Sequence, residues 1–125
     1  GIMDVLYGLY DNLEDIRRKR EVIIFEGCKS VLLAYTWGIR NCAAALTSHL
    51  NPRQMKILAK LGCRVVFAFD KEIRPREDHN IQILKNYVNV EYLWDKDDLL
   101  DDKDAPVDKG PEVFKKLYEG RLSYR

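Results

Sequence analysis

The sequence is poor in the residues that build disulfide frameworks, zinc sites and catalytic triads. It contains three cysteines and two histidines in 125 residues, and no cysteine pair has a C-x-x-C spacing. An odd number of thiols in or beside apolar segments is typical of reduced core cysteines, so we predict no redox or zinc role for Cys28, Cys42 or Cys63. His49 and His79 have no partners at a suitable spacing and are interpreted as surface or capping residues.

A large charge imbalance and a long apolar run are also absent. Lys and Arg total 21 against 20 for Asp and Glu, a formal net charge of +1. Any binding of nucleic acid must therefore use local patches or metal-bridged phosphates. No apolar run approaches the roughly 20 residues of a membrane span, and the N-terminus has no signal-peptide pattern. We expect one compact cytoplasmic domain over residues 1–125, with no membrane partner.

Short apolar runs alternate with amphipathic stretches along the chain. This rhythm predicts an α/β fold, with about four parallel strands in one sheet and helices on both faces. Gly38 and Gly62 follow two of the amphipathic stretches and Asn51-Pro52 starts one, which supports these helix ends. The expected strands are 22–26, 41–46, 64–69 and 88–94. The expected helices are 11–20, 29–37, 52–61, 78–86 and 111–118.

Acidic residues follow directly on two of the predicted strands, as Glu26-Gly27 and Asp70-Lys71-Glu72. The carboxyl ends of parallel strands lie on one edge of a sheet, so these acids should converge within a strand spacing or two, each about 4.8 Å. Clustered carboxylates call for a cation, and hard oxygen ligands suit Mg²⁺ or Mn²⁺. We interpret Glu26 as a metal ligand or general base, and Asp70 with Glu72 as a chelating pair from which Lys71 points away. The alternative is two polar strand exits, with a surface ion pair to Lys71.

A second acidic segment, at 95–110, follows the fourth predicted strand. Asp104 and Asp108 could reach the same edge of the sheet, with a slight preference for Asp104, and Asp95 competes by its position. A solvated acidic loop is nearly as good an interpretation of this segment. Lys29 lies at the start of a predicted helix, where phosphates bind, although a solvated lysine explains it equally well.

Basic and aromatic residues give weaker signals. The cations at 17–20 end a predicted helix, where they complement the helix dipole, and we favour this interpretation over phosphate binding. Four aromatic residues are interpreted as core or rim residues rather than as base-stacking platforms. They are Tyr7, Tyr10, Trp37 and Trp94.

The two acidic strand ends resemble the signatures of the Toprim domain, which bacterial and phage primases share with topoisomerases and some nucleases. A strand ending in Glu-Gly appears at 22–27, and a strand ending in Asp-x-Asp appears at 65–72 with Glu72 as its last acid. The primase branch fits best, because three further stretches resemble primases. They are 6–10, 38–54 and 103–110.

The resemblance implies a Rossmann-like Toprim domain that forms a fragment of a larger DnaG-type primase. Such an enzyme makes RNA primers on single-stranded DNA from ribonucleoside triphosphates. Mg²⁺ or Mn²⁺ would bind Glu26, Asp70, Glu72 and either Asp104 or Asp108. The zinc-binding and basic template-gripping parts of a primase are absent from this sequence, so we expect no primer synthesis by the fragment alone. A replicative helicase is expected as a partner that the missing parts would contact.

Three departures from the primase pattern concern the site. Glu72 is one methylene longer than the usual aspartate, Ser30 stands where many primases have a further acid, and Thr47 replaces a frequent glycine. A stand-alone Toprim nuclease is the main alternative. A topoisomerase is disfavoured because no separate domain offers a tyrosine nucleophile. A receiver-like or flavodoxin-like binding module is disfavoured because no adjacent pair of acids follows the first strand.

Overall fold

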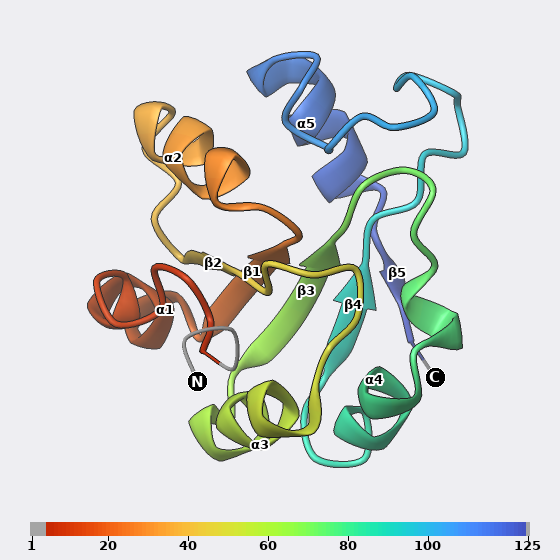
Figure 1. Ribbon diagram of the computed structural model, residues 1–125. Helices are drawn as coiled ribbons and strands as arrows, with labels where there is room; N and C mark the ends of the chain where they lie inside the picture. The colour runs from red at the N-terminus through yellow and green to blue at the C-terminus, as the bar shows by residue number, and fades with distance from the viewer. Residues whose placement is uncertain (1–4, 125) are drawn as a thin grey trace.

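A five-stranded sheet runs through the computed structural model, which describes residues 5–124 (Figure 1). The strands are β1 (Glu21–Phe25), β2 (Cys42–Ala44), β3 (Arg64–Ala68), β4 (Val90–Tyr92) and β5 (Leu122–Ser123). Their order in the sheet is β2-β1-β3-β4-β5, in which the first four are parallel and β5 is antiparallel to β4. The predicted α/β fold and its four parallel strands are confirmed, and β5 is an addition.

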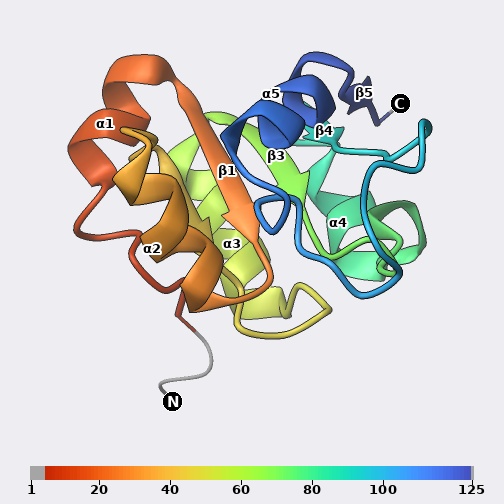
Figure 2. The ribbon, with the colours of Figure 1, turned by 90° about the horizontal axis from the view of Figure 1, so that it is seen from above.

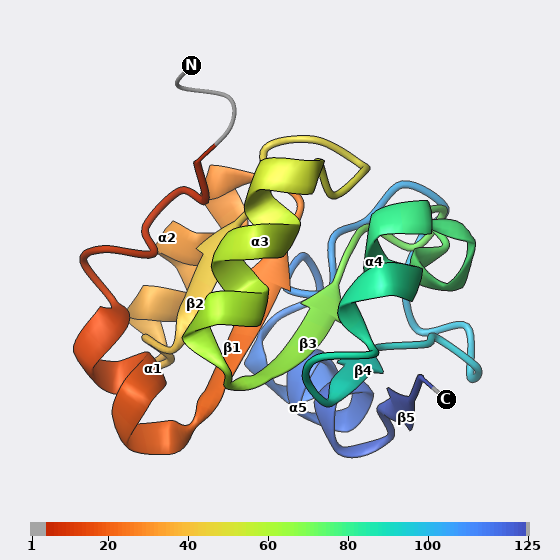
Figure 3. The same cartoon turned by 90° about the horizontal axis from the view of Figure 1, so that it is seen from below.

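Helices cover both faces of the sheet, as predicted. Helices α3 and α4 lie on one face (Figure 3), and α2 and α5 lie on the other (Figure 2), while α1 lies beside the β2 edge. All five predicted helices are present, and a short 3₁₀ helix, η2 (Pro75–Glu77), precedes α4. The helices are α1 (Leu13–Lys19), α2 (Cys28–Thr36), α3 (Pro52–Leu61), α4 (His79–Leu84) and α5 (Pro111–Glu119).

The helix ends follow from local side-chain chemistry. The Asn51 side chain accepts a hydrogen bond from the N–H of Gln54, whose side chain in turn accepts from the N–H of Asn51, a reciprocal cap that starts α3. Gly62 ends α3 in the left-handed conformation, with φ of 73°. Asp78 caps α4 by accepting from the N–H groups of Asn80 and Ile81.

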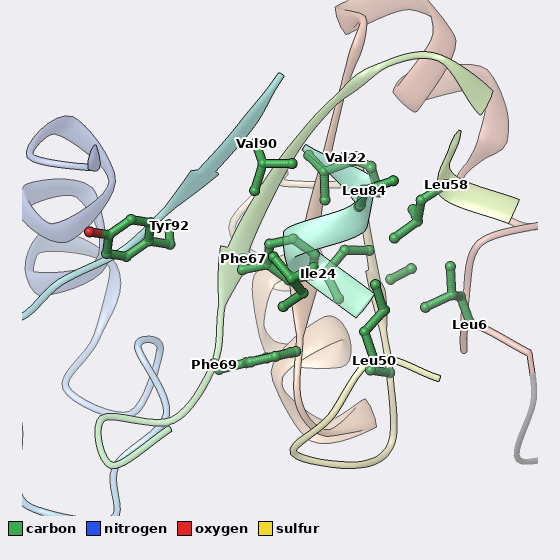
Figure 4. Close-up of a cluster of buried hydrophobic side chains, with 14 of the residues drawn as sticks. Leu6, Val22, Ile24, Leu50, Leu58, Phe67, Phe69, Leu84, Val90 and Tyr92 are labelled. Carbon is green, nitrogen blue, oxygen red and sulfur yellow. The ribbon is translucent and has the colours of Figure 1, made fainter. Parts of the chain in front are cut away.

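Two apolar clusters, one on each face of the sheet, form the core. Val22 and Ile24 of β1 pack toward α3 and α4 (Figure 4), whereas Ile23 and Phe25 pack toward α2 and α5. All five residues of β1 are buried, as expected for a central strand of a parallel sheet. No helix within residues 5–124 is long and apolar enough to cross a membrane.

The predicted burial of the cysteines and the surface positions of the histidines hold with one exception. Cys42 is fully buried in β2, and this burial raises the pKa of its thiol to about 12. Cys63 is half-buried, but Cys28 is exposed at the start of α2, so the prediction of a core thiol is wrong there. His49 and His79 lie at the surface, as predicted.

The four aromatic residues spread over a wide range of exposure. Trp37 is half-buried against Phe114, with ring centroids 6.4 Å apart, and Tyr7 and Trp94 lie at the rim. Tyr10 is 90% exposed, so its assignment to the core or rim is wrong. The cations at 17–19 occupy the last turn of α1, where they complement the helix dipole.

Candidate metal and nucleotide site at the carboxyl edge of the sheet

Glu26 and Asp70 leave the sheet at the same edge because β1 and β3 are adjacent and parallel. Phe25, the last residue of β1, is in register with Ala68, the last residue of β3. Glu26 follows Phe25 directly, and Asp70 lies two residues beyond Ala68. The carboxyl groups of the two acids approach within hydrogen-bonding reach, so the predicted convergence of the two strand ends is found.

The close approach changes the acidity of Asp70. Burial raises the pKa of Asp70 to about 7, and the hydrogen bond with Glu26 and the negative charges of Glu26, Asp108 and Glu72 act in the same direction. Two carboxyl groups this close cannot both ionise without cost, so Asp70 holds its proton more tightly than a free aspartate does. A bound cation would take the place of that proton.

Glu26 also has an unsatisfied oxygen. Within residues 5–124, its Oε2 atom is buried and finds no hydrogen-bond partner. A buried carboxylate oxygen without a partner is costly, and such groups are usually explained by catalysis or by an ion. Gly27, which follows, has an ordinary extended conformation with φ of −113°, and nothing lies within 4 Å of the position that a Cβ would take. The donor chemistry and the open space beside Gly27 therefore fit a hard divalent cation.

The acidic segment at 95–110 contributes Asp108 more directly than Asp104. The charge of Asp108 acts on Asp70. The Asp104 carboxylate instead accepts the N–H of Asp101 at 2.8 Å and lies 3.3 Å from Lys109 Nζ. These two interactions lower the pKa of Asp104, the hydrogen bond from Asp101 most of all. The Asp108 carboxylate also folds the loop, because it accepts the N–H of Ala105 at 2.9 Å, so the preference for Asp104 stays a prediction.

Lys71 holds the acidic loop against the end of β3. Its ammonium donates to the carboxylate of Asp98 and, at 2.8 Å, to the carbonyl of Leu100, and its backbone N–H donates to the carbonyl of Asp104 at 2.9 Å. Lys71 is thus engaged with the acidic loop. Residues 71–72 lie in a turn, closed by the hydrogen bond from the N–H of Ile73 to the carbonyl of Asp70 at 2.9 Å, so the prediction of an extended backbone there is wrong. The alternative interpretation, a polar strand exit, includes a surface ion pair to Lys71. Lys71 makes its ion pairs with Asp95 and Asp98, which leaves Asp70 and Glu72 outside them.

Asp95 supports the same loop and is already engaged. Its two carboxylate oxygens accept the N–H groups of Leu99 and Leu100, each at 2.8 Å, and Lys71 Nζ lies 3.3 Å away. Burial raises the pKa of Asp95, but these hydrogen bonds and the charge of Lys71 together lower it by more. The pKa of Asp95 therefore lies below its usual range. The loop is thus folded by its own carboxylates rather than simply solvated.

The predicted ligands do not form one compact coordination shell. In the part of the chain that the structure describes, no three His, Cys, Asp or Glu side chains are close enough together to hold a metal ion. Glu26 and Asp70 are brought together, and Glu72 and Asp108 are near enough for their charges to act on Asp70. Lys29 is exposed in the first turn of α2. Metal ligation by Glu26, Asp70, Glu72, Asp104 and Asp108, and phosphate binding by Lys29, stay predictions.

A pocket with a volume of about 550 Å³ adjoins Asp70 and was not predicted. It lies beyond the ends of β3 and β4, between the segment at 73–77 and the acidic loop. Trp94, the last residue of the fourth predicted strand, was the one available signal. Besides Asp70 and Trp94, its lining includes Phe69, Arg74, Arg76, Tyr92, Leu100 and Leu117.

A second polar cluster, also absent from the predictions, lies at the opposite end of β1. The buried Glu21 accepts hydrogen bonds from the Tyr118 hydroxyl at 2.5 Å and from Asn41 Nδ2 at 3.3 Å, and Arg64 lies 3.5 Å away. Burial, together with Glu21, raises the pKa of Tyr118 to about 12. The polar groups of this cluster are hydrogen-bonded or ion-paired with one another, so we interpret the cluster as structural.

Comparison with known proteins gives relatives in sequence and in fold. No protein-family model matches the chain. The SPbeta prophage-derived uncharacterized protein YorJ of Bacillus subtilis is 34% identical over 94% of this chain and 36% of its own length. The DNA primase of Borreliella burgdorferi is 28% identical over 54% of this chain and 13% of its own length.

Solved primase structures share the fold. The zinc-binding and RNA polymerase domains of the Aquifex aeolicus primase superpose with a TM-score of 0.71 and 23% identity, over 98% of this chain and 31% of that one. A DnaG primase catalytic domain bound to single-stranded DNA gives a TM-score of 0.65 and 19% identity, over 94% of this chain and 39% of that one. The chain spans 31–39% of the length of these three relatives, which it matches over 94–98% of its own length. It therefore resembles DnaG-type DNA primases in sequence and carries the Toprim fold of their catalytic cores.

Proposed function

We propose that this chain is the metal-binding Toprim subdomain of a primase-type nucleotidyltransferase, which binds Mg²⁺ or Mn²⁺ and the phosphates of ribonucleoside triphosphates. The observation that carries the proposal is the Glu26–Asp70 pair, in which burial and the nearby carboxyl group of Glu26 raise the pKa of Asp70 and a buried Glu26 oxygen has no partner among residues 5–124. In a structural ion pair, a neighbouring side chain neutralises the carboxylate. In a cation site, the carboxylates stay without a partner until the ion binds. The shared fold of primase catalytic cores is consistent with this proposal.

Four carboxylates would hold the cation, namely Glu26, Asp70, Glu72 and Asp108. The divalent ion would supply positive charge that positions the triphosphate and stabilises its reacting oxygens. Asp70, whose pKa is raised to about 7, would release its proton on binding the cation, so affinity would rise with pH. Asp104 would join only after leaving Lys109, and Glu26 has the alternative role of general acid or base.

Template binding and primer synthesis would depend on a larger protein. One solved relative is a DnaG catalytic domain bound to single-stranded DNA, and this chain covers 39% of it. With a net charge of +1, the chain has no broad basic field of its own for a DNA strand. We therefore propose that single-stranded DNA and a replicative helicase are partners of the whole protein, which would act in the cytoplasm, and that this portion alone makes no primers.

Paramagnetic Mn²⁺ titration tests the metal site directly. Amide NMR signals around Glu26, Asp70 and Asp108 should broaden first, and the double variant Glu26→Gln with Asp70→Asn should lose at least roughly tenfold in affinity, since each carboxylate contributes charge to the ion. Asp102→Asn is the matched control, because Asp102 is an exposed acid of the same loop. Broadening centred on 97–102, or unchanged affinity in the double variant, contradicts the proposal.

Product analysis separates the proposal from the nuclease alternative. The same acids could cut a phosphodiester bond, so the purified chain is incubated with Mn²⁺ and labelled single-stranded DNA or RNA. We expect no cleavage. Hydrolysis that disappears in the double variant would instead favour a stand-alone nuclease.

A further inference from the structure

The pocket beside Asp70 has the size and the position of a second subsite. Its volume of about 550 Å³ lies within the range of about 300–1,000 Å³ that is typical of small-molecule sites. Asp70 lines both the pocket and the candidate cation site. A ligand seated in the pocket would therefore have one end next to a cation bound at Glu26 and Asp70.

An aromatic floor and one exposed ring make the pocket suitable for a flat, apolar group. Phe69 and Tyr92 are 6% and 9% exposed, so they form a fixed floor rather than mobile walls. Trp94 is 54% exposed and lines the same pocket, which leaves much of its indole ring free to stack. Nucleobases stack well on such rings, whatever their sequence identity.

Two cations at the pocket have no carboxylate partners. Among residues 5–124, the guanidinium groups of Arg74 and Arg76 make no ion pair. Their backbone carbonyls accept hydrogen bonds, that of Arg74 from the N–H of Glu77 and that of Arg76 from Gln82 and Tyr124. Lys71, by contrast, is already neutralised by Asp95 and Asp98. Free guanidinium groups suit phosphate oxygens, which they bind through paired N–H donors.

We propose that this pocket binds the base of a nucleotide, stacked on Trp94 over the floor of Phe69 and Tyr92. Arg74 and Arg76 would contact the phosphates on their way to the cation at Glu26 and Asp70. The inference rests on the proposed function for the phosphate end of the ligand and on the pocket itself for the base end. It adds a base-binding subsite to the acidic edge.

Fluorescence with matched probes tests the two ends separately. Trp37→Phe leaves Trp94 as the only tryptophan, and Trp94→Phe leaves Trp37, which packs against Phe114 on the other face of the sheet. The probes are ATP, inorganic tripolyphosphate and adenosine, each with and without Mg²⁺, and calorimetry measures their affinities for the full chain. We expect ATP and adenosine to quench Trp94 but not Trp37. Trp94→Ala should weaken ATP by roughly 5- to 150-fold and leave tripolyphosphate unchanged.

The outcomes distinguish the pocket from the cation site. If tripolyphosphate binds with Mg²⁺ but ATP binds no more tightly and leaves Trp94 unquenched, the base subsite is overturned and the proposed function stands. If tripolyphosphate does not bind but adenosine still quenches Trp94, the subsite is supported and the phosphate site is overturned. Silence from all three probes overturns both. Arg74→Gln with Arg76→Gln gives a second variant at the surface, which should weaken ATP without unfolding the chain, because both side chains are exposed.

Discussion

Replacing Asp70 by asparagine should make the free protein more stable at alkaline pH. An acid whose pKa is raised on folding binds its proton more tightly in the native state, so the free energy of unfolding falls as pH rises from the ordinary value of 3.8 to about 7. Above that range the loss is complete. Asparagine carries no charge, and its amide can donate to Glu26 as the protonated Asp70 does, so Asp70→Asn should not show this loss.

The size of the effect follows from the pKa of Asp70, about 7. Of the range between about pH 5 and about pH 8, about two pH units lie below the pKa of Asp70. The free energy of unfolding of the wild-type protein falls there by about 1.36 kcal/mol per unit, which sets an upper limit of about 3 kcal/mol on the effect. Asp70 is partly exposed, and solvent screening reduces the expected gain of the variant to about 1–2 kcal/mol.

Urea unfolding in the presence of a chelator measures this difference. The free energy of unfolding is compared for the wild type and Asp70→Asn at both pH values, with the exposed Asp102→Asn as control. Adding Mg²⁺ at the higher pH should then stabilise the wild type but not Asp70→Asn, because only the native carboxylates bind the ion. An advantage of Asp70→Asn that is equal at the two pH values would refute the reasoning.

Two further predictions concern the core and the thiols. Gln54 is fully buried and donates to the carbonyl of Ala45 at 2.9 Å, so Gln54→Ala should lower the free energy of unfolding by about 2–4 kcal/mol. The control Lys56→Ala, at an exposed position, should change it by about 0.5 kcal/mol or less. Urea titration measures both, and equal effects would contradict the capping role of Gln54. Ellman's reagent should modify Cys28 first in the native protein and Cys42 only on unfolding, because burial raises the pKa of the Cys42 thiol to about 12 and keeps it protonated. A fast phase of modification that survives Cys28→Ser would contradict this burial.

Residues that start and end helices, together with apolar runs, explain why most elements could be predicted from the sequence. The helix over 52–61 was predicted to the residue because Asn51-Pro52 and Gly62 fix its two ends chemically. The strands at 22–26 and 64–69 are continuous apolar runs, and parallel pairing then brings the acids that follow them together. The Glu26–Asp70 approach was thus predictable from topology alone.

The missing features depend on contacts between distant segments. β5 has only two residues, both exposed, and exists because Leu122 and Ser123 pair with β4. The carboxylates of Asp104 and Asp108 both accept N–H groups of their own loop, from Asp101 and Ala105, and Asp104 also lies 3.3 Å from Lys109. Nothing in the order of residues signals which of several neighbouring acids will fold a loop and which will face the sheet.

The two edges of the sheet limit how a longer protein can be built around this domain. On the β2 side, Ala44 and Tyr7 exchange backbone hydrogen bonds of 2.8 and 2.9 Å, which occupies the outward-facing groups of the strand. On the other side, the sheet ends in the two-residue, antiparallel β5. Short or covered edges discourage strand addition from another chain. Neighbouring domains would therefore attach through helices and loops, and the width of this sheet would stay the same whatever protein contains it.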